Sequence, residues 1–150
     1  MSKAGFNQVE SRAVISLSSL YLVRMLGLFM ALPVLSLYAD DYRQSTPFLI
    51  GVAIGIYGLS QAFLQLPLGL LSDRIGRRPV IIGGLLMLTA GSVVAATADS
   101  IYGLIAGRFM QGAGAIASAM MALLADLTRE SNRTKAMAAV GASIGLSFML

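Results

Sequence analysis

The sequence predicts an all-α membrane protein with four membrane-spanning helices and part of a fifth. Hydrophobic residues make up 57% of the 150-residue chain, charged residues make up 12%, and the mean hydropathy is +0.79. Soluble domains carry about a quarter charged residues, so this chain is too apolar for that class. Five apolar segments approach the ~20 residues that a bilayer-crossing helix requires. They cover residues 13–38, 47–71, 79–98, 101–124 and 136–150.

The first segment, 13–38, is too long for the apolar core of a cleavable signal peptide, and it carries Arg24 in its middle. We therefore expect it to remain as the first membrane helix. Pro47 and Pro79 mark the first helical positions of the next two segments, where a missing N–H costs nothing. Asp99 and Ser100 offer an N-cap for the fourth.

The fifth segment, 136–150, reaches the end of the chain without a cap or a stop signal, and it is too short to cross a bilayer. We therefore expect the chain to be the N-terminal part of a longer membrane protein.

Basic residues indicate the orientation. One set of termini and loops holds Lys3, Arg12, Arg74, Arg77, Arg78, Arg129, Arg133 and Lys135. The opposite side holds only Arg43, together with Asp40, Asp41 and Asp99. The positive-inside rule therefore predicts a cytoplasmic N-terminus. It also explains the pI of about 9.9 without a nucleic-acid partner, because the cations lie in short loops between apolar spans.

The chain contains no cysteine and no histidine. This excludes disulfides, thiolate metal sites and cysteine nucleophiles, and it removes the commonest general base. We expect no catalytic centre, no metal and no cofactor.

Two aspartates occupy unfavourable positions. Asp73 and Asp126 each end a predicted span on the cytoplasmic side, where the helix macrodipole is negative. If the two helix ends are neighbours, both carboxylates can share the cations Arg74, Arg77 and Arg78. The alternative is a set of solvated loop charges with little energetic effect.

Two arginines lie within predicted spans. Arg24 and Arg108 have no carboxylate at comparable depth, and a cation inside a span costs at least ~2.5 kcal/mol. We expect their partners to be an anionic substrate, backbone carbonyls or acids outside this chain. Snorkelling to the outer surface is the alternative for Arg108.

Polar residues form two stripes at helical spacing. Tyr57, Gln61 and Gln65 share one face, and Arg108 and Gln111 share another. Such faces are typical of a wet cavity, with hydrogen bonds between helices as the alternative.

Pairs of glycines four residues apart predict close helix crossings. The pairs are Gly51 with Gly55, Gly103 with Gly107, and Gly141 with Gly145.

Residues 69–81, Gly-Leu-Leu-Ser-Asp-Arg-Ile-Gly-Arg-Arg-Pro-Val-Ile, resemble motif A of the major facilitator superfamily. The segment that begins at Arg108 resembles motif B, with matches at Arg108, Gln111, Gly112 and Gly114. The wider pattern is most similar to the YajR-type subgroup of bacterial drug/proton antiporters.

The resemblance implies a bundle of twelve helices in two halves, with the substrate held between them and exposed to each side in turn. It implies that Asp73 meets a helix of the other half and that Arg77 pairs with Asp126. Gly69 would permit the close contact between halves, and Gly76 the turn. The resemblance assigns Arg108 to proton coupling, and the coupling acid would lie outside these spans.

We therefore predict a secondary transporter of a bacterial inner membrane that exports small amphipathic compounds or drugs in exchange for protons. Its predicted partners are a small-molecule substrate, protons, the lipid bilayer and the remaining half of the transporter. One alternative is an importer of sugars or organic anions with the same architecture. Another is a membrane module that senses or scaffolds without transport.

Overall fold

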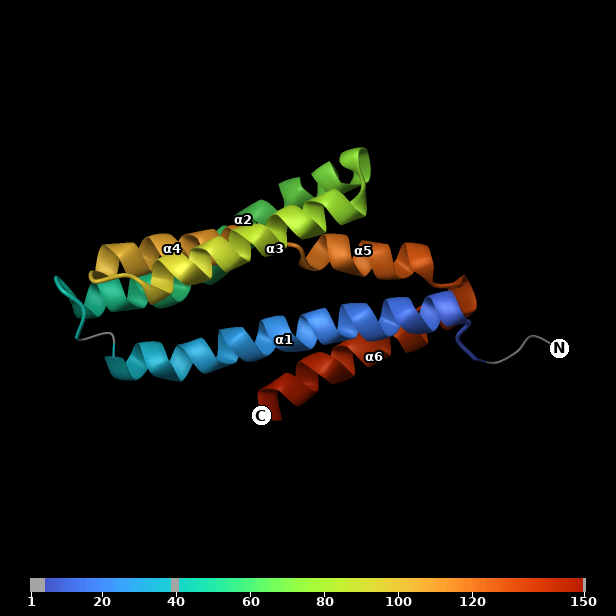
Figure 1. The fold of residues 1–150 in the computed structure, drawn as a ribbon, viewed down its shortest axis with the longest axis horizontal. Helices are drawn as coiled ribbons and strands as arrows, with labels where there is room; N and C mark the ends of the chain where they lie inside the picture. The colour runs from blue at the N-terminus through green and yellow to red at the C-terminus, as the bar shows by residue number, and fades with distance from the viewer. Residues whose placement is uncertain (1–4, 39–40, 150) are drawn as a thin grey trace. The chain divides into compact units, whose positions relative to one another are not determined.

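The computed structural model describes residues 5–38 and 41–149, and its regular structure is helical (Figure 1). The helices are α1 (Gln8–Tyr38), α2 (Pro47–Ile75), α3 (Arg77–Ala96), α4 (Ile101–Ala113), α5 (Ala117–Leu127) and α6 (Glu130–Met149). Two of the charged residues used to predict the orientation, Lys3 and Asp40, lie outside the described residues.

Four helical stretches are long and apolar enough to cross a membrane: Gln8–Tyr38, Pro47–Ile75, Arg77–Ala96 and Ile101–Leu127. Their outer surfaces carry large apolar side chains, among them Phe63, Leu66 and Leu70 of α2. Lipid accepts such a surface, whereas water does not. The chain is therefore an all-α membrane protein.

The turn between α2 and α3 is shorter than the sequence predicts. α2 continues to Ile75 and α3 begins at Arg77, so Gly76 alone separates them. Its φ of 100° and ψ of 154° are accessible to glycine but rarely to other residues. Pro79 is accordingly the third residue of α3 and not the first, which the first helical turn still tolerates.

The predicted span over 101–124 is interrupted, because the structure divides this stretch into α4 and α5. Gly112 and Gly114 lie at the break, and each glycine lowers helix propensity by ~1 kcal/mol. The N–H of Gly114 closes α4 by donating to the carbonyl of Met110 at 3.2 Å. α4 and α5 together remain long enough to span.

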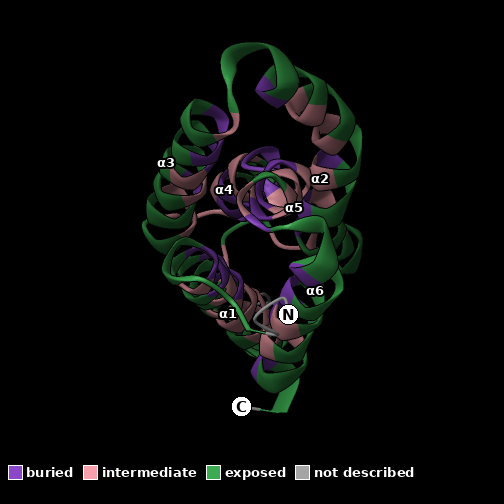
Figure 2. Cartoon of the chain, turned by 90° about the vertical axis from the view of Figure 1, so that its right-hand side faces the viewer, coloured by how far each residue is buried: buried purple, intermediate pink, exposed green. Residues whose placement is uncertain are grey.

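The described helices form two compact units. One unit comprises residues 32–119, and α4 lies between α2 and α3 within it. Buried residues gather on α4, whereas α2 and α3 expose their outer faces (Figure 2). A core cluster at one end of this unit contains Leu35, Ala53, Ile101 and Leu104.

Glycines set the helix spacing in this unit. A Cβ atom at Gly91 would lie 2.6 Å from the backbone nitrogen of Gln111, and one at Gly107 would lie 2.5 Å from that of Ala95. A Cβ at Gly112 would overlap the carbonyl of Tyr57. α4 therefore packs closely against α3 and α2 because these positions carry no side chain.

The glycine pairs predicted from spacing are only partly correct. Gly107 lies at a crossing with α3, as expected, whereas a Cβ at Gly103 would meet Ala98 in the connection between α3 and α4. The other pairs do not, since a Cβ at Gly51, Gly55 or either glycine of α6 would meet no described atom within 4 Å. Spacing alone does not identify which face of a helix meets a neighbour.

The second unit contains residues 1–31 and 120–150. In its described part, the ring centroids of Phe29 in α1 and Phe148 in α6 lie 3.9 Å apart. Contact between two aromatic rings contributes packing energy in addition to lost surface area.

Candidate functional site

The predicted charge cluster begins at the turn between α2 and α3. Asp73 forms an ion pair with Arg77, whose Nη1 also donates to the hydroxyl of Ser72 at 2.8 Å. That hydroxyl donates to the carbonyl of Gly69 at 2.6 Å. The side chains of Asp73 and Arg77 are 55% and 24% exposed, so the pair itself contributes at most about 1 kcal/mol. Its effect is to orient the guanidinium at the turn.

The other cations lie around this turn. Arg74, in the last turn of α2, and Arg78, in the first turn of α3, are exposed. Asp126 is an exposed residue of α5 in the second unit. Its predicted contact with Arg77 therefore stays a prediction.

Gly69 lies close to the start of α5. A Cβ atom there would be 3.2 Å from the hydroxyl oxygen of Ser118, and that hydroxyl donates to the carbonyl of Gln65 at 3.3 Å. The small side chain of Ser118 and the absence of one at Gly69 permit this approach within the first unit.

The candidate cavity residues of the first unit meet at Arg108. This arginine is only 3% exposed, although it lies in an apolar span. Its Cζ atom lies 5.0 Å from the ring centroid of Tyr57, and its Nη1 donates to Oε1 of Gln111 at 3.0 Å. The Nε2 of Gln111 donates in turn to the hydroxyl of Ser92 in α3 at 2.9 Å. Three helices thus orient one guanidinium.

One edge of that guanidinium is unoccupied by protein. The Nε and Nη2 atoms of Arg108 are buried and have no hydrogen-bond partner among the described residues. These two donors form the edge with which arginine binds a carboxylate in a bidentate manner. Because an unpaired buried donor is costly, this edge is a candidate site for an anionic group.

The remaining cavity candidates are placed as follows. Gln61 and Gln65 are half-buried on the face of α2 that carries Tyr57. Arg24 is 8% exposed and lies in α1, within the second unit. The structure therefore brings Tyr57, Arg108 and Gln111 together. The common cavity that would include Arg24 stays a prediction.

Among residues 5–38 and 41–149, no group of three histidine, cysteine, aspartate or glutamate side chains could hold a metal ion.

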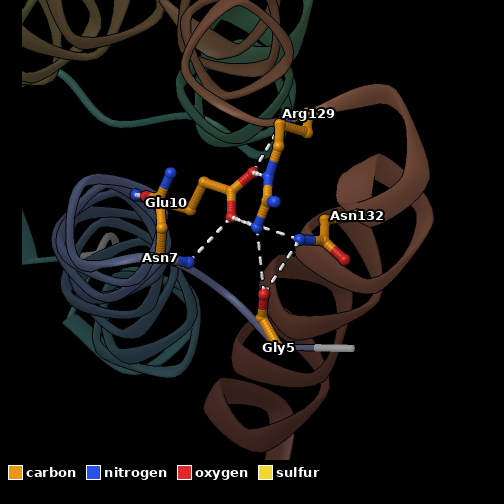
Figure 3. A network of polar contacts seen from close by, with 5 residues as sticks. All are labelled: Gly5, Asn7, Glu10, Arg129 and Asn132. Atoms are coloured by element: carbon orange, nitrogen blue, oxygen red, sulfur yellow. Dashed lines mark hydrogen bonds and ion pairs between the residues drawn. The ribbon is translucent and has the colours of Figure 1, made fainter. Parts of the chain in front are cut away.

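A polar network that was not predicted from the sequence joins α1 to the connection between α5 and α6 (Figure 3). Glu10 is 1% exposed and forms an ion pair with Arg129. The amide of Asn132 donates to the same carboxylate at 3.1 Å, and Arg129 also donates to the carbonyl of Gly5. Hydrogen bonding to Glu10 raises the pKa of Arg129. A sequence signal existed, because Asn7-x-x-Glu10 is a helix N-capping pattern.

The buried cation, the apolar helices and the charged helix ends define a helical, multi-pass membrane protein with a polar site between its spans. The chain belongs to the Major Facilitator Superfamily, whose family model matches residues 17–150.

Relatives agree with this assignment. The chain is 59% identical to the inner membrane transport protein YajR of Escherichia coli K12 over 94% of its own length and 31% of that protein. It is 30% identical to the class B tetracycline resistance protein of Escherichia coli, over 85% of the chain and 33% of the relative. It is 35% identical to the multidrug resistance protein MdtH of Aeromonas salmonicida, over 69% of the chain and 25% of the relative.

The chain thus spans between a quarter and a third of the length of these relatives. The predicted family and all-α membrane fold are confirmed, and the relatives are transporters and not enzymes. YajR is an inner membrane protein by name, and the four apolar helices of this chain support a multi-pass location in the inner membrane.

Proposed function

We propose that this chain is the N-terminal part of a proton-coupled exporter of small amphipathic compounds. It would supply four spans and part of a fifth, and the other half of the transporter would supply the opposing cavity wall. The names of two relatives support the choice of substrate class, since one is a tetracycline resistance protein and the other a multidrug resistance protein.

The buried Arg108 carries the proposal. A guanidinium stays protonated, so Arg108 would act by binding an anionic group and not by releasing a proton. That group would be an acid whose proton is exchanged during transport, or the substrate itself. Tyr57 and Gln111 orient the guanidinium, and Gln61, Gln65 and Arg24 would complete the cavity lining.

The charged turn would act as a conformational latch on the cytoplasmic side. In this proposal Arg77 bridges Asp73 and Asp126, and neighbouring cations Arg74 and Arg78 offset the remaining negative charge. Gly76 permits the turn, and Gly69 the close packing beside it. The N-terminus and this turn would face the cytoplasm, because the basic residues concentrate there.

Inside-out membrane vesicles that contain the full-length transporter test the proposal. With an imposed pH gradient, acid inside, we expect radiolabelled tetracycline to accumulate and a pH-sensitive dye to report simultaneous proton release. Tetracycline uptake that is unaffected by collapse of the gradient would contradict proton coupling.

A second function is favoured by one observation. The Nε–Nη2 edge of Arg108 fits a carboxylate, as an importer of organic anions would require. In right-side-out vesicles with an outside-acid gradient, this alternative predicts accumulation of radiolabelled gluconate, a polar organic anion that does not cross lipid unaided. The exporter predicts none.

A further inference from the structure

The carboxylate of Glu10 belongs to a capping box at the start of α1. Asn7 immediately precedes the helix, and its side-chain oxygen accepts from the backbone N–H of Glu10 at 2.8 Å. In return, Oε2 of Glu10 accepts from the backbone N–H of Asn7 at 2.9 Å. This reciprocal pair satisfies two N–H groups at the helix start.

The same carboxylate also serves the start of α6. Arg129 immediately precedes α6, and its backbone N–H donates to Oε1 of Glu10 at 2.8 Å. The Nε and Nη2 atoms of its side chain donate to Oε1 and Oε2, both at 2.9 Å (Figure 3). The positive ends of two helix dipoles therefore meet at one buried anion.

The segment held in this way carries Asp126. Thr128 donates its hydroxyl proton to the carbonyl of Leu124, and Nε of Arg133 donates to the carbonyl of Ala125 at 3.2 Å. These bonds occupy two carbonyls near the end of α5. One donor lies in the connection and the other in α6. The backbone around Asp126 is thus fixed from α5, α6 and α1.

We propose that Glu10 is a positioning residue: by capping α1 and α6 together, it holds the connection after α5 and thereby sets the position of Asp126. The part that concerns Asp126 rests on the proposed latch. The network itself lies within one unit of the fold.

Hydrogen exchange of the full-length transporter tests the double cap. Glu10→Gln keeps the side-chain size but removes the charge, and we expect amides of residues 124–131 to exchange at least about tenfold faster. Glu130→Gln is the matched control, since Glu130 is an exposed glutamate in the first turn of α6. Unchanged exchange in Glu10→Gln would overturn the proposal.

A charge exchange separates a double cap from a simple ion pair. We expect Glu10→Arg combined with Arg129→Glu to leave exchange fast, because an arginine at position 10 would face the positive ends of two helices. Restored protection in this double variant would overturn the double cap.

The proposed latch would hold the cytoplasmic side closed, so the population of the outward-open state tests the action through Asp126. One spin label is placed at Leu37, an exposed residue near the end of α1, and one at the outer end of the other half. The distance between the two labels in the absence of substrate measures this population. Glu10→Gln and Asp126→Asn should each lower this population, and the double variant should match Asp126→Asn. Effects that add would overturn the positioning role. A wild-type population in Asp126→Asn would contradict the latch, whereas the exchange experiment tests the cap independently.

Discussion

Arg108 is the residue whose burial is hardest to explain by packing alone. A cation inside a span costs at least ~2.5 kcal/mol, and two of its donors are unsatisfied among the described residues. The cation–π contact with Tyr57 and the bond to Gln111 recover part of this cost. In the proposed function, Arg108 therefore serves binding and not stability.

We therefore predict that Arg108→Ala in the full-length transporter lowers tetracycline flux at least about tenfold, which corresponds to the loss of one charge-assisted contact. The melting temperature in detergent should not fall, because the change removes a buried charge that has no carboxylate partner within the described part of the chain. Arg43→Ala, on the connection between α1 and α2, is the control and should retain flux. Equal flux in the two variants would exclude a transport role for Arg108.

At this scale, residues on one helix face were predictable and long-range partners were not. Four-residue and three-residue spacings in the sequence are enough to single out Tyr57 and the Arg108–Gln111 pair. Ser92 could not be found in this way, because it reaches Gln111 from another helix. Glu10 likewise contacts Arg129, which lies 119 residues later in the sequence, so this contact could not be predicted. Only the capping pattern of Glu10 was visible in the sequence.

Among the elements, the contact between α3 and α4 depends on glycine. Gly91 and Gly107 face the opposite backbone, whereas a Cβ atom at Gly83, also in α3, would meet no described atom within 4 Å. All of these glycines are visible in the sequence, but their positions at or away from a crossing are not. Only packing distinguishes them.

The two α3 glycines offer a matched pair of substitutions. We predict that Gly91→Ala destabilises the folded transporter by about 1–3 kcal/mol, as forced overpacking does. Gly83→Ala should be neutral or stabilising by up to ~1 kcal/mol, because alanine favours helix and meets nothing there. Denaturant unfolding in mixed micelles measures both. Equal stability of the two variants would mean that α3 and α4 do not pack closely.

Helix ends were predicted less well than helix existence. The charged stretch after residue 71 reads as a loop, yet the structure keeps Asp73 and Arg74 helical and turns at Gly76 alone. Charged residues tolerate a helical end where cations offset the dipole, so polarity does not by itself end a helix. The break between α4 and α5 was missed for the converse reason, since apolar composition conceals the glycines at 112 and 114.

For the whole molecule, the family and the membrane fold followed from apolar length, charge distribution and the segment at 69–81, and the family model confirms them. The pairing of Arg77 with Asp126 stays a prediction, because the two residues belong to different units of this chain. The proposed latch depends on this pairing more than on any other contact.

Charge reversal in the full-length transporter tests the pairing most directly, with flux of radiolabelled tetracycline as the measurement. Arg77→Asp and Asp126→Arg should each lower flux at least about tenfold, because each places like charges together. The double variant restores opposite charges, so it should recover a substantial part of the flux lost in either single variant. Flux in the double variant no higher than in the single variants would contradict the latch.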